Sequence, residues 1–223
     1  MDFKLLFQGL TKVISGLLVM ALLIFIPAGS LAYWQGWLLL GILFIPMLVA
    51  GFVMMFKCPD LLRKRLNVKE QQKEQKAIIL LSGLMFVAAF VVAGLGYRLG
   101  WFILPKMVSI VATVVFLLAY LLYAEVMREN AYLSRTVEVQ ENQKVVDTGL
   151  YGFVRHPMYM ATLLLFLAMP LVLGSIISFA ITLLYIPIIN GRMKNEEKVL
   201  SEGLKGYKEY LQKVKYRVIP FVW

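Results

Sequence analysis

The sequence has little of the chemistry that builds disulfides and metal centres. Its 223 residues include one cysteine, Cys58, and one histidine, His156. A single cysteine excludes an internal disulfide, and one histidine beside it leaves no set of soft ligands for a zinc or haem site. Acidic residues are also few, since 13 Asp and Glu stand against 23 Lys and Arg. We therefore expect no metal, and any chemistry has to use other groups.

Long apolar runs are abundant instead. Hydrophobic residues make up 61% of the chain, charged residues 16%, and the mean hydropathy is +0.77, whereas soluble domains are nearer half apolar. A helix needs about 20 residues to cross the hydrocarbon core of a bilayer, and four runs reach that length. The last two are shorter and meet at Gly174-Ser175. The runs fall at 13–33, 36–56, 77–97, 104–126, 157–173 and 176–190.

These runs predict an all-α, polytopic integral membrane protein with about four spans and a C-terminal helical hairpin; six full spans are the alternative. No repeat or linker divides the chain, so we expect one domain. Residues 1–126 would supply the N-terminal transmembrane helices. Residues 127–223 would supply a polar connector, the hairpin and a C-terminal helix.

Positive charge is distributed unevenly. The segments before residue 13 and at 57–76, 127–156 and 191–223 contain 21 of the 23 Lys and Arg residues. An even number of crossings places these segments on one side, and the positive-inside rule then predicts that both termini are cytoplasmic. The net charge of +10 indicates attraction to anionic membrane lipids, and no nucleic-acid partner is expected. The basic loop at 57–76 either sets the topology or forms a lid.

Two shorter patterns describe the cytoplasmic region. Residues 136–140 alternate apolar and polar side chains, as a short extended segment would. Further on, apolar side chains recur at helical spacing and predict one stripe of a C-terminal helix. These residues are Tyr207, Tyr210, Leu211 and Val214.

A candidate site forms where the hairpin begins and ends. Arg155 and His156 precede Pro157, which suits the first turn of a helix, and a helix N-terminus facing the cytoplasm favours anions. Arg192 and Glu196 are four residues apart and share a helix face, whereas Glu197 points elsewhere. Because a hairpin returns to the face at which it starts, both charged groups should converge on one pocket on the cytoplasmic face.

Each of these residues also has a structural interpretation. Arg192 and Glu196 would form a surface ion pair, and His156 would cap the hairpin helix or bond a backbone carbonyl. Tyr151 and Tyr159 would belong to an interfacial aromatic belt. For Glu125, a pair with Arg128 is favoured over a functional role.

The motifs together resemble a known family. Gly149-Leu150-Tyr151, Arg155-His156-Pro157-Met158-Tyr159 and Arg192-x-x-x-Glu196-Glu197 are followed by Gly206-Tyr207-x-x-Tyr210 and Ile219-Pro220. This combination resembles the isoprenylcysteine carboxyl methyltransferases, to which phospholipid methyltransferases are related. The resemblance covers about residues 135–223, and the earlier spans share only their hydrophobicity.

The resemblance implies an S-adenosylmethionine-dependent methyl transfer with a cofactor site in the C-terminal half. The catalytic candidates it implies are Arg192, which would face the substrate, with Arg155 and His156. An amine acceptor would first lose a proton, for which His156 or a glutamate is the candidate base. The cofactor-binding candidates are Gln140, Gln143, Lys144, Val145, Val146, Tyr151, His156, Pro157, Met158, Tyr159 and Glu196.

The expected activity is methylation of a lipophilic or lipidated acceptor, foremost the carboxylate of an isoprenylcysteine-like compound. A phospholipid or other lipid-amine N-methyltransferase is the alternative. A non-catalytic transporter or scaffold is the third possibility. Transporters carry ionisable residues near the middle of several spans, whereas here they gather at one membrane face, which argues against transport.

Overall fold

The computed structural model describes residues 3–66, 73–101, 103–134 and 136–223. Within these ranges the chain is helical, and its only β-pairing is an isolated bridge between Ile103 and Ser175. The first five helices are α1 (Phe3–Ala28), α2 (Trp34–Lys57), α3 (Pro59–Leu66), α4 (Lys73–Leu99) and α5 (Lys106–Glu129). They are followed by η1 (Gly149–Gly152), α6 (Pro157–Val172), α7 (Ile176–Thr182), α8 (Tyr185–Gly203) and α9 (Tyr207–Lys213).

Five helical segments are long and apolar enough to cross a membrane. They are α1, α2, α4, α5 and the segment Ile176–Gly203, which combines α7 with α8. Helix α6 is a shorter apolar helix of 16 residues. The prediction of an all-α polytopic membrane protein with a C-terminal hairpin is confirmed.

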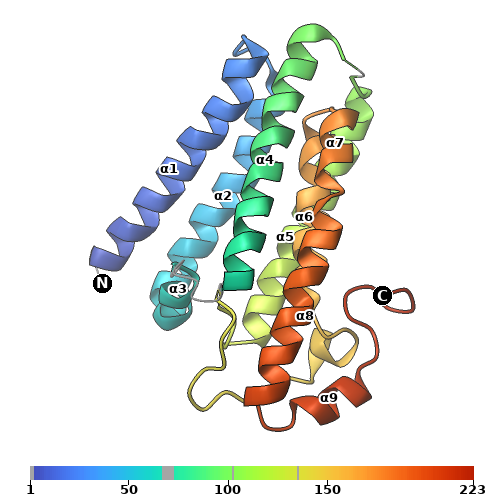
Figure 1. The fold of residues 1–223 in the computed structure, drawn as a ribbon. Coiled ribbons are helices and arrows are strands. Elements are labelled where there is room, and N and C mark those ends of the chain that lie inside the picture. Colours follow the sequence, from blue (N-terminus) through green and yellow to red (C-terminus); the bar gives the residue numbers. More distant parts are fainter. Residues whose placement is uncertain (1–2, 67–72, 102, 135) are drawn as a thin grey trace.

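The long helices run side by side and alternate in direction (Figure 1). Helix α3, the polar connector at 130–148 and α9 gather at one end of the bundle, which we call the connector end (Figure 1). Both chain ends lie toward it (Figure 1). Of the basic loop expected at 57–76, residues 59–66 form α3, and residues 67–72 lie outside the described part of the chain.

The first span is Phe3–Ala28, whereas its apolar run is 13–33. The helix therefore begins nearly three turns earlier than predicted and ends between one and two turns earlier. Gly29 ends the helix because it has a φ of +63°, in the left-handed region that glycine tolerates. At the other end, the helix continues through Lys4 and Lys12, polar residues that the hydropathy pattern excluded. The ammonium of Lys12 donates to the backbone carbonyl of Leu66, which joins α1 to α3.

The hairpin turns at Gly174, as predicted, and this residue has a φ of +72°. Its second arm is interrupted between Thr182 and Tyr185. Pro187 explains the interruption, since it has no N–H to donate to the carbonyl of Leu183. Beyond this point α8 continues to Gly203 and carries the arm out of the apolar region.

One hydrophobic core joins the two halves of the chain. Ile24 of α1, Leu39 of α2, Phe116 of α5 and Val172 of α6 all belong to it and are fully buried. Helices α1 and α4 also approach backbone to backbone, since a Cβ on Gly94 would lie 2.5 Å from the carbonyl oxygen of Ile24. The wall that α1 and α4 form is therefore closely packed.

The two shorter patterns have different outcomes. Residues 136–140 form no strand, although Val137 is buried. The predicted stripe in α9 is confirmed, because Tyr207, Tyr210 and Val214 are buried in one cluster with Leu211 packed against it. This cluster holds α9 against the connector.

Candidate functional site

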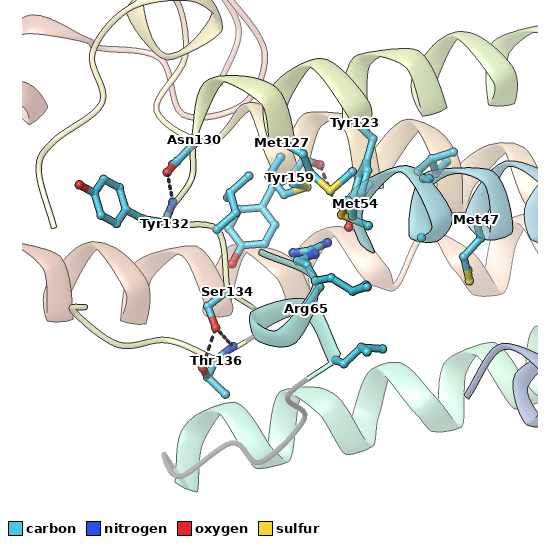
Figure 2. A pocket seen from close by; sticks show the side chains of 18 of the residues that line it. Met47, Met54, Arg65, Tyr123, Met127, Asn130, Tyr132, Ser134, Thr136 and Tyr159 are labelled. Carbon is cyan, nitrogen blue, oxygen red and sulfur yellow. Dashed lines mark hydrogen bonds between the residues drawn. The ribbon is translucent and has the colours of Figure 1, made fainter. Parts of the chain in front are cut away.

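A cavity of about 1220 Å³ opens at the connector end and extends between the helices. One part is apolar and lies among α1, α2 and α3; we call it the apolar arm. Figure 2 shows two of its methionines, Met47 and Met54, of which Met54 lies near Arg65. The apolar arm is lined by Leu5, Gly9, Val13, Met47, Met54, Met55 and Leu62. The other part is lined by the connector and the hairpin helices.

One face of α8 lines the second part of the cavity. Its lining residues recur at a spacing of three and four, as residues on one face of a helix do. Arg192 and Glu196 both belong to this face, so the prediction that they share a face and open on one pocket with the start of the hairpin is confirmed. The α8 lining residues are Tyr185, Ile189, Arg192, Glu196 and Leu200.

Tyr159 connects the two charged residues. Its hydroxyl donates to a carboxylate oxygen of Glu196 and accepts a hydrogen bond from Nε of Arg192 at 3.0 Å. Arg192 also donates from a terminal nitrogen to Oε1 of Gln75, on α4, at 3.1 Å. We call Tyr159, Arg192 and Glu196 the polar wall. The residues are hydrogen-bonded in the interior of the site, so they are not a surface ion pair.

Glu197 points away from this face of α8, as expected. On the other side of the helix its carboxylate pairs with three positively charged or basic groups. Its carboxylate lies 3.2 Å from Nε2 of His156, 3.4 Å from Nε of Arg155 and 2.8 Å from Arg217. Three groups that carry or accept positive charge thus surround one buried carboxylate. Glu197 and Arg217 were not among the predicted site residues, although the pair of glutamates at 196 and 197 was a visible signal.

The C-terminal segment completes this arrangement. The backbone N–H groups of Arg155 and His156 donate to the carbonyls of Tyr216 and Arg217, at 2.9 and 2.8 Å. Backbone and side-chain bonds therefore fix the start of the hairpin from the same segment. Since Arg155 and His156 also line the cavity, their side chains are held between Glu197 and the cavity.

His156 caps α6 only through its backbone. It occupies the N-cap position without a side-chain capping bond, and its carbonyl accepts from the N–H groups of Tyr159 and Met160. Its imidazole is buried against Glu197 instead. The expected cap of the hairpin helix is therefore confirmed for the backbone of His156, whereas its side chain pairs with Glu197.

Tyr151 is fixed by the end of α5. The carboxylate of Glu129 accepts from the N–H of Leu150, and Asn130 donates its side-chain amide to the hydroxyl of Tyr151 at 3.0 Å. Tyr210 donates to the carbonyl of Tyr151 at 2.8 Å. Burial raises the pKa of Tyr151, so its hydroxyl stays protonated. A buried tyrosine in this network is not an interfacial belt residue.

The connector brings most of the remaining cofactor candidates to the cavity. Met158, at the start of α6, lines the cavity too. The cofactor candidates of the connector that line it are Gln143, Lys144, Val145 and Val146. At the edge of this region the ammonium of Lys213 hydrogen-bonds Asp147 at 2.7 Å and lowers the pKa of that carboxyl.

Gln140 and Pro157 are not among the lining residues. Gln140 shapes the connector, because its amide donates to the carbonyl of Tyr132 and its N–H donates to the side-chain oxygen of Gln143 at 2.8 Å. Pro157 is the first residue of α6 and is buried. Both residues therefore lie beside the site rather than on its surface.

Helix α3 contributes a wall that the sequence did not identify. The guanidinium of Arg65 lies 5.3 Å from the ring centroid of Tyr123, and the ammonium of Lys64 lies 5.8 Å from that of Tyr132. Figure 2 shows Arg65 next to Tyr123 and Met127. Cation–π contacts of this kind hold α3 to α5 and the connector. No sequence signal distinguished Arg65 from its basic neighbours.

Glu125 has the structural role expected of it. Its carboxylate pairs with the guanidinium of Arg128 at 2.5 Å, on the exposed side of α5. It is absent from the cavity lining.

The chain is similar to two kinds of known protein. Residues 107–206 match the model of the phospholipid methyltransferase family. A stretch of 91 residues is 28% identical to the Delta(14)-sterol reductase TM7SF2 of Mus musculus, covering 40% of this chain and 22% of the reductase. The chain thus spans about a fifth of the length of that curated relative. The family match contains η1, both hairpin helices and the polar wall, and it supports a membrane methyltransferase.

Proposed function

We propose that this protein transfers a methyl group from S-adenosylmethionine to a lipophilic acceptor, foremost the carboxylate of an isoprenylcysteine-like compound. The continuity of the cavity carries the proposal. A single void joins the polar wall and the connector to the apolar arm among α1, α2 and α3. A polar cofactor and a lipid chain can therefore lie in one space with their reacting ends adjacent.

The groups around the polar wall fit the cofactor. S-adenosylmethionine would supply the electrophilic methyl group on its sulfonium. Glu196 would accept hydrogen bonds from its ammonium or ribose, and the aromatic faces of Tyr151 and Tyr159 would flank its cationic or adenine portion. Gln143 and Lys144, from the connector, would add polar contacts. Arg155 and His156 would be kept in place by Glu197.

Charge around the cavity favours an anionic acceptor. Five lysines and arginines line it, against the two glutamates Glu138 and Glu196; the cations are Lys12, Arg65, Lys144, Arg155 and Arg192. Arg192 would hold the acceptor carboxylate, since a guanidinium binds a carboxylate in a planar, two-point geometry. An ionised carboxylate is already a nucleophile, so these residues need only align it and exclude water.

A lipid amine is the second candidate acceptor, because the matching family is named for phospholipids. An amine must lose a proton before it attacks, and His156 with Glu197 would form the acid–base pair. The imidazole of His156 lies 3.2 Å from that carboxylate. The lysines and arginines that line the cavity would then bind the lipid phosphate.

Cofactor binding tests the proposal first. We expect detergent-purified protein to bind S-adenosylmethionine and the Glu196→Ala variant to bind it at least tenfold more weakly, as loss of a charged hydrogen bond predicts. Glu202→Ala is the matched control, since Glu202 is exposed on the same helix. Absence of binding by the wild type would refute the methyltransferase proposal. Binding of a reduced nicotinamide dinucleotide instead would favour a reductase, as in the sterol reductase relative.

The acceptor is tested with labelled cofactor. A prenylcysteine analogue and vesicles of phosphatidylethanolamine are supplied separately, and we expect label to enter the prenylcysteine analogue. An alkali-labile product would identify a methyl ester. Label confined to the lipid amine would reject the carboxylate acceptor and retain the methyltransferase.

A further inference from the structure

The cation at the polar wall is held from three helices. Arg192 projects from α8, its Nε donates to the hydroxyl of Tyr159 on α6, and a terminal nitrogen donates to Oε1 of Gln75 on α4. A guanidinium is planar, so hydrogen bonds at two of its nitrogens define the direction of the whole group. Gln75 is thus one of the residues that orient Arg192.

Gln75 has the burial expected of such a fixed point. Its side chain is fully buried, whereas most glutamines in proteins are exposed. Burying an amide is unfavourable unless it is hydrogen-bonded, and the contact of its oxygen with Arg192 supplies that compensation. Its Nε2 finds no hydrogen-bond partner in the described ranges.

The chemistry of the partner also matters. An amide oxygen accepts a hydrogen bond without carrying a charge, so it orients a cation without neutralising it. Glu197 is different, because it brings a negative charge to Arg155 and Arg217. Gln75 thus orients Arg192 without adding a negative charge of its own.

We infer that Gln75 is a positioning residue that directs Arg192 toward the anionic group of the acceptor. The inference rests on the proposed function and extends it to the N-terminal half, because Gln75 lies outside the segment 107–206 that matches the methyltransferase family. Gln75 does not line the cavity itself, so it acts through Arg192.

The test uses full-length protein with Gln75→Leu and Gln75→Glu, assayed with S-adenosylmethionine and a prenylcysteine analogue. We expect Gln75→Leu to raise the acceptor KM about tenfold, as loss of a hydrogen bond to a charged group predicts. The dissociation constant of S-adenosylmethionine should change less than about twofold, because Arg192 faces the acceptor and not the cofactor. Gln35→Leu is the matched control, since Gln35 is buried in α2, and its acceptor KM should stay at the wild-type value.

Gln75→Glu supplies a readout that a purely structural role would not move. The introduced carboxyl competes with the acceptor for Arg192, so the acceptor KM should be raised at neutral pH and should fall toward the wild-type value as acidification protonates it. This isosteric variant also serves if Gln75→Leu fails to fold. Wild-type acceptor KM values at all pH values in folded Gln75 variants would overturn the inference. A wild type that neither binds nor uses S-adenosylmethionine would instead refute the proposed function.

Discussion

Gly149 lies against Glu129 so closely that no other residue fits without a shift. A Cβ built on Gly149 would lie 1.8 Å from a carboxylate oxygen of Glu129, and Gly149 has a φ of +54°. The same carboxylate accepts the N–H of Leu150. This contact starts the turn that delivers Tyr151 to the cavity, so steric fit at one glycine controls part of the site.

Gly149→Ala should destabilise this turn. The left-handed backbone at Gly149 should lower the free energy of unfolding by about 1–2 kcal/mol. The added Cβ displaces the Glu129 carboxylate from the N–H of Leu150, and the lost hydrogen bond should cost about 1 kcal/mol more and weaken cofactor binding. Gly100→Ala separates the two causes, since Gly100 has a φ of +69° but nothing within 4 Å of its Cβ position. The control should lose only about 1–2 kcal/mol. Thermal unfolding in detergent measures both, and equal losses would show that the clash is relieved without cost.

Glu197→Gln should leave a cluster of positive groups without its counter-charge. Breaking a buried ion pair is strongly unfavourable, and with Arg217 partly exposed we expect a loss of about 2–3 kcal/mol in unfolding free energy. Asp147→Asn is the contrasting variant, because the Asp147–Lys213 pair is exposed and such pairs contribute little. Unfolding of both variants at neutral pH checks this, and equal stability of Glu197→Gln and wild type would contradict it.

Tyr159→Phe should uncouple Arg192 from Glu196 without changing the shape of the cavity. Both partners lose a hydrogen bond, so kcat/KM should fall about tenfold or more. Tyr120→Phe is the matched control, since Tyr120 also lines the cavity but donates to the backbone carbonyl of Leu43. Comparable losses in the two variants would assign the effect to general packing.

The native cysteine offers a test of orientation. We propose that both termini face the cytoplasm, which places the exposed Cys58 there as well. A membrane-impermeant maleimide should then label Cys58 in lysed cells but not in intact cells. Lys106→Cys in a Cys58→Ser background should already be labelled in intact cells, because Lys106 begins α5 at the opposite end of the bundle (Figure 1). The opposite pattern would invert the topology.

The spans and the hairpin were predictable because hydrophobic length and turn residues are local properties. Gly174 could be identified as a turn from its neighbours, and Arg192 and Glu196 could be placed together from helical spacing alone. The start of α1 was missed because hydropathy excludes Lys4 and Lys12, which the folded chain keeps in the helix.

Contacts between distant segments were not predictable in the same way. Glu197 finds its partners on the loop before α6 and on the C-terminal segment, and no spacing rule relates these positions. In the sequence, Gln75 is one of several polar residues in a basic loop. Only the packing of α4 on α8 places it against Arg192. Gln140 differs from what the resemblance implied, because its amide donates to the backbone of the connector and it does not line the cavity.

The pairing of Arg155 and His156 with Tyr216 and Arg217 bears on how the protein is made. A ribosome synthesises the start of the hairpin before it reaches Tyr216 and Arg217, so the contacts around Arg155 and His156 can close only after the C-terminal segment has been made. Until the last segment emerges, these groups depend on water or on the translocation machinery for solvation. Completion of the candidate site is consequently a late event, and a chain halted before Tyr216 would lack both the backbone bonds at the start of the hairpin and the pair of Glu197 with Arg217.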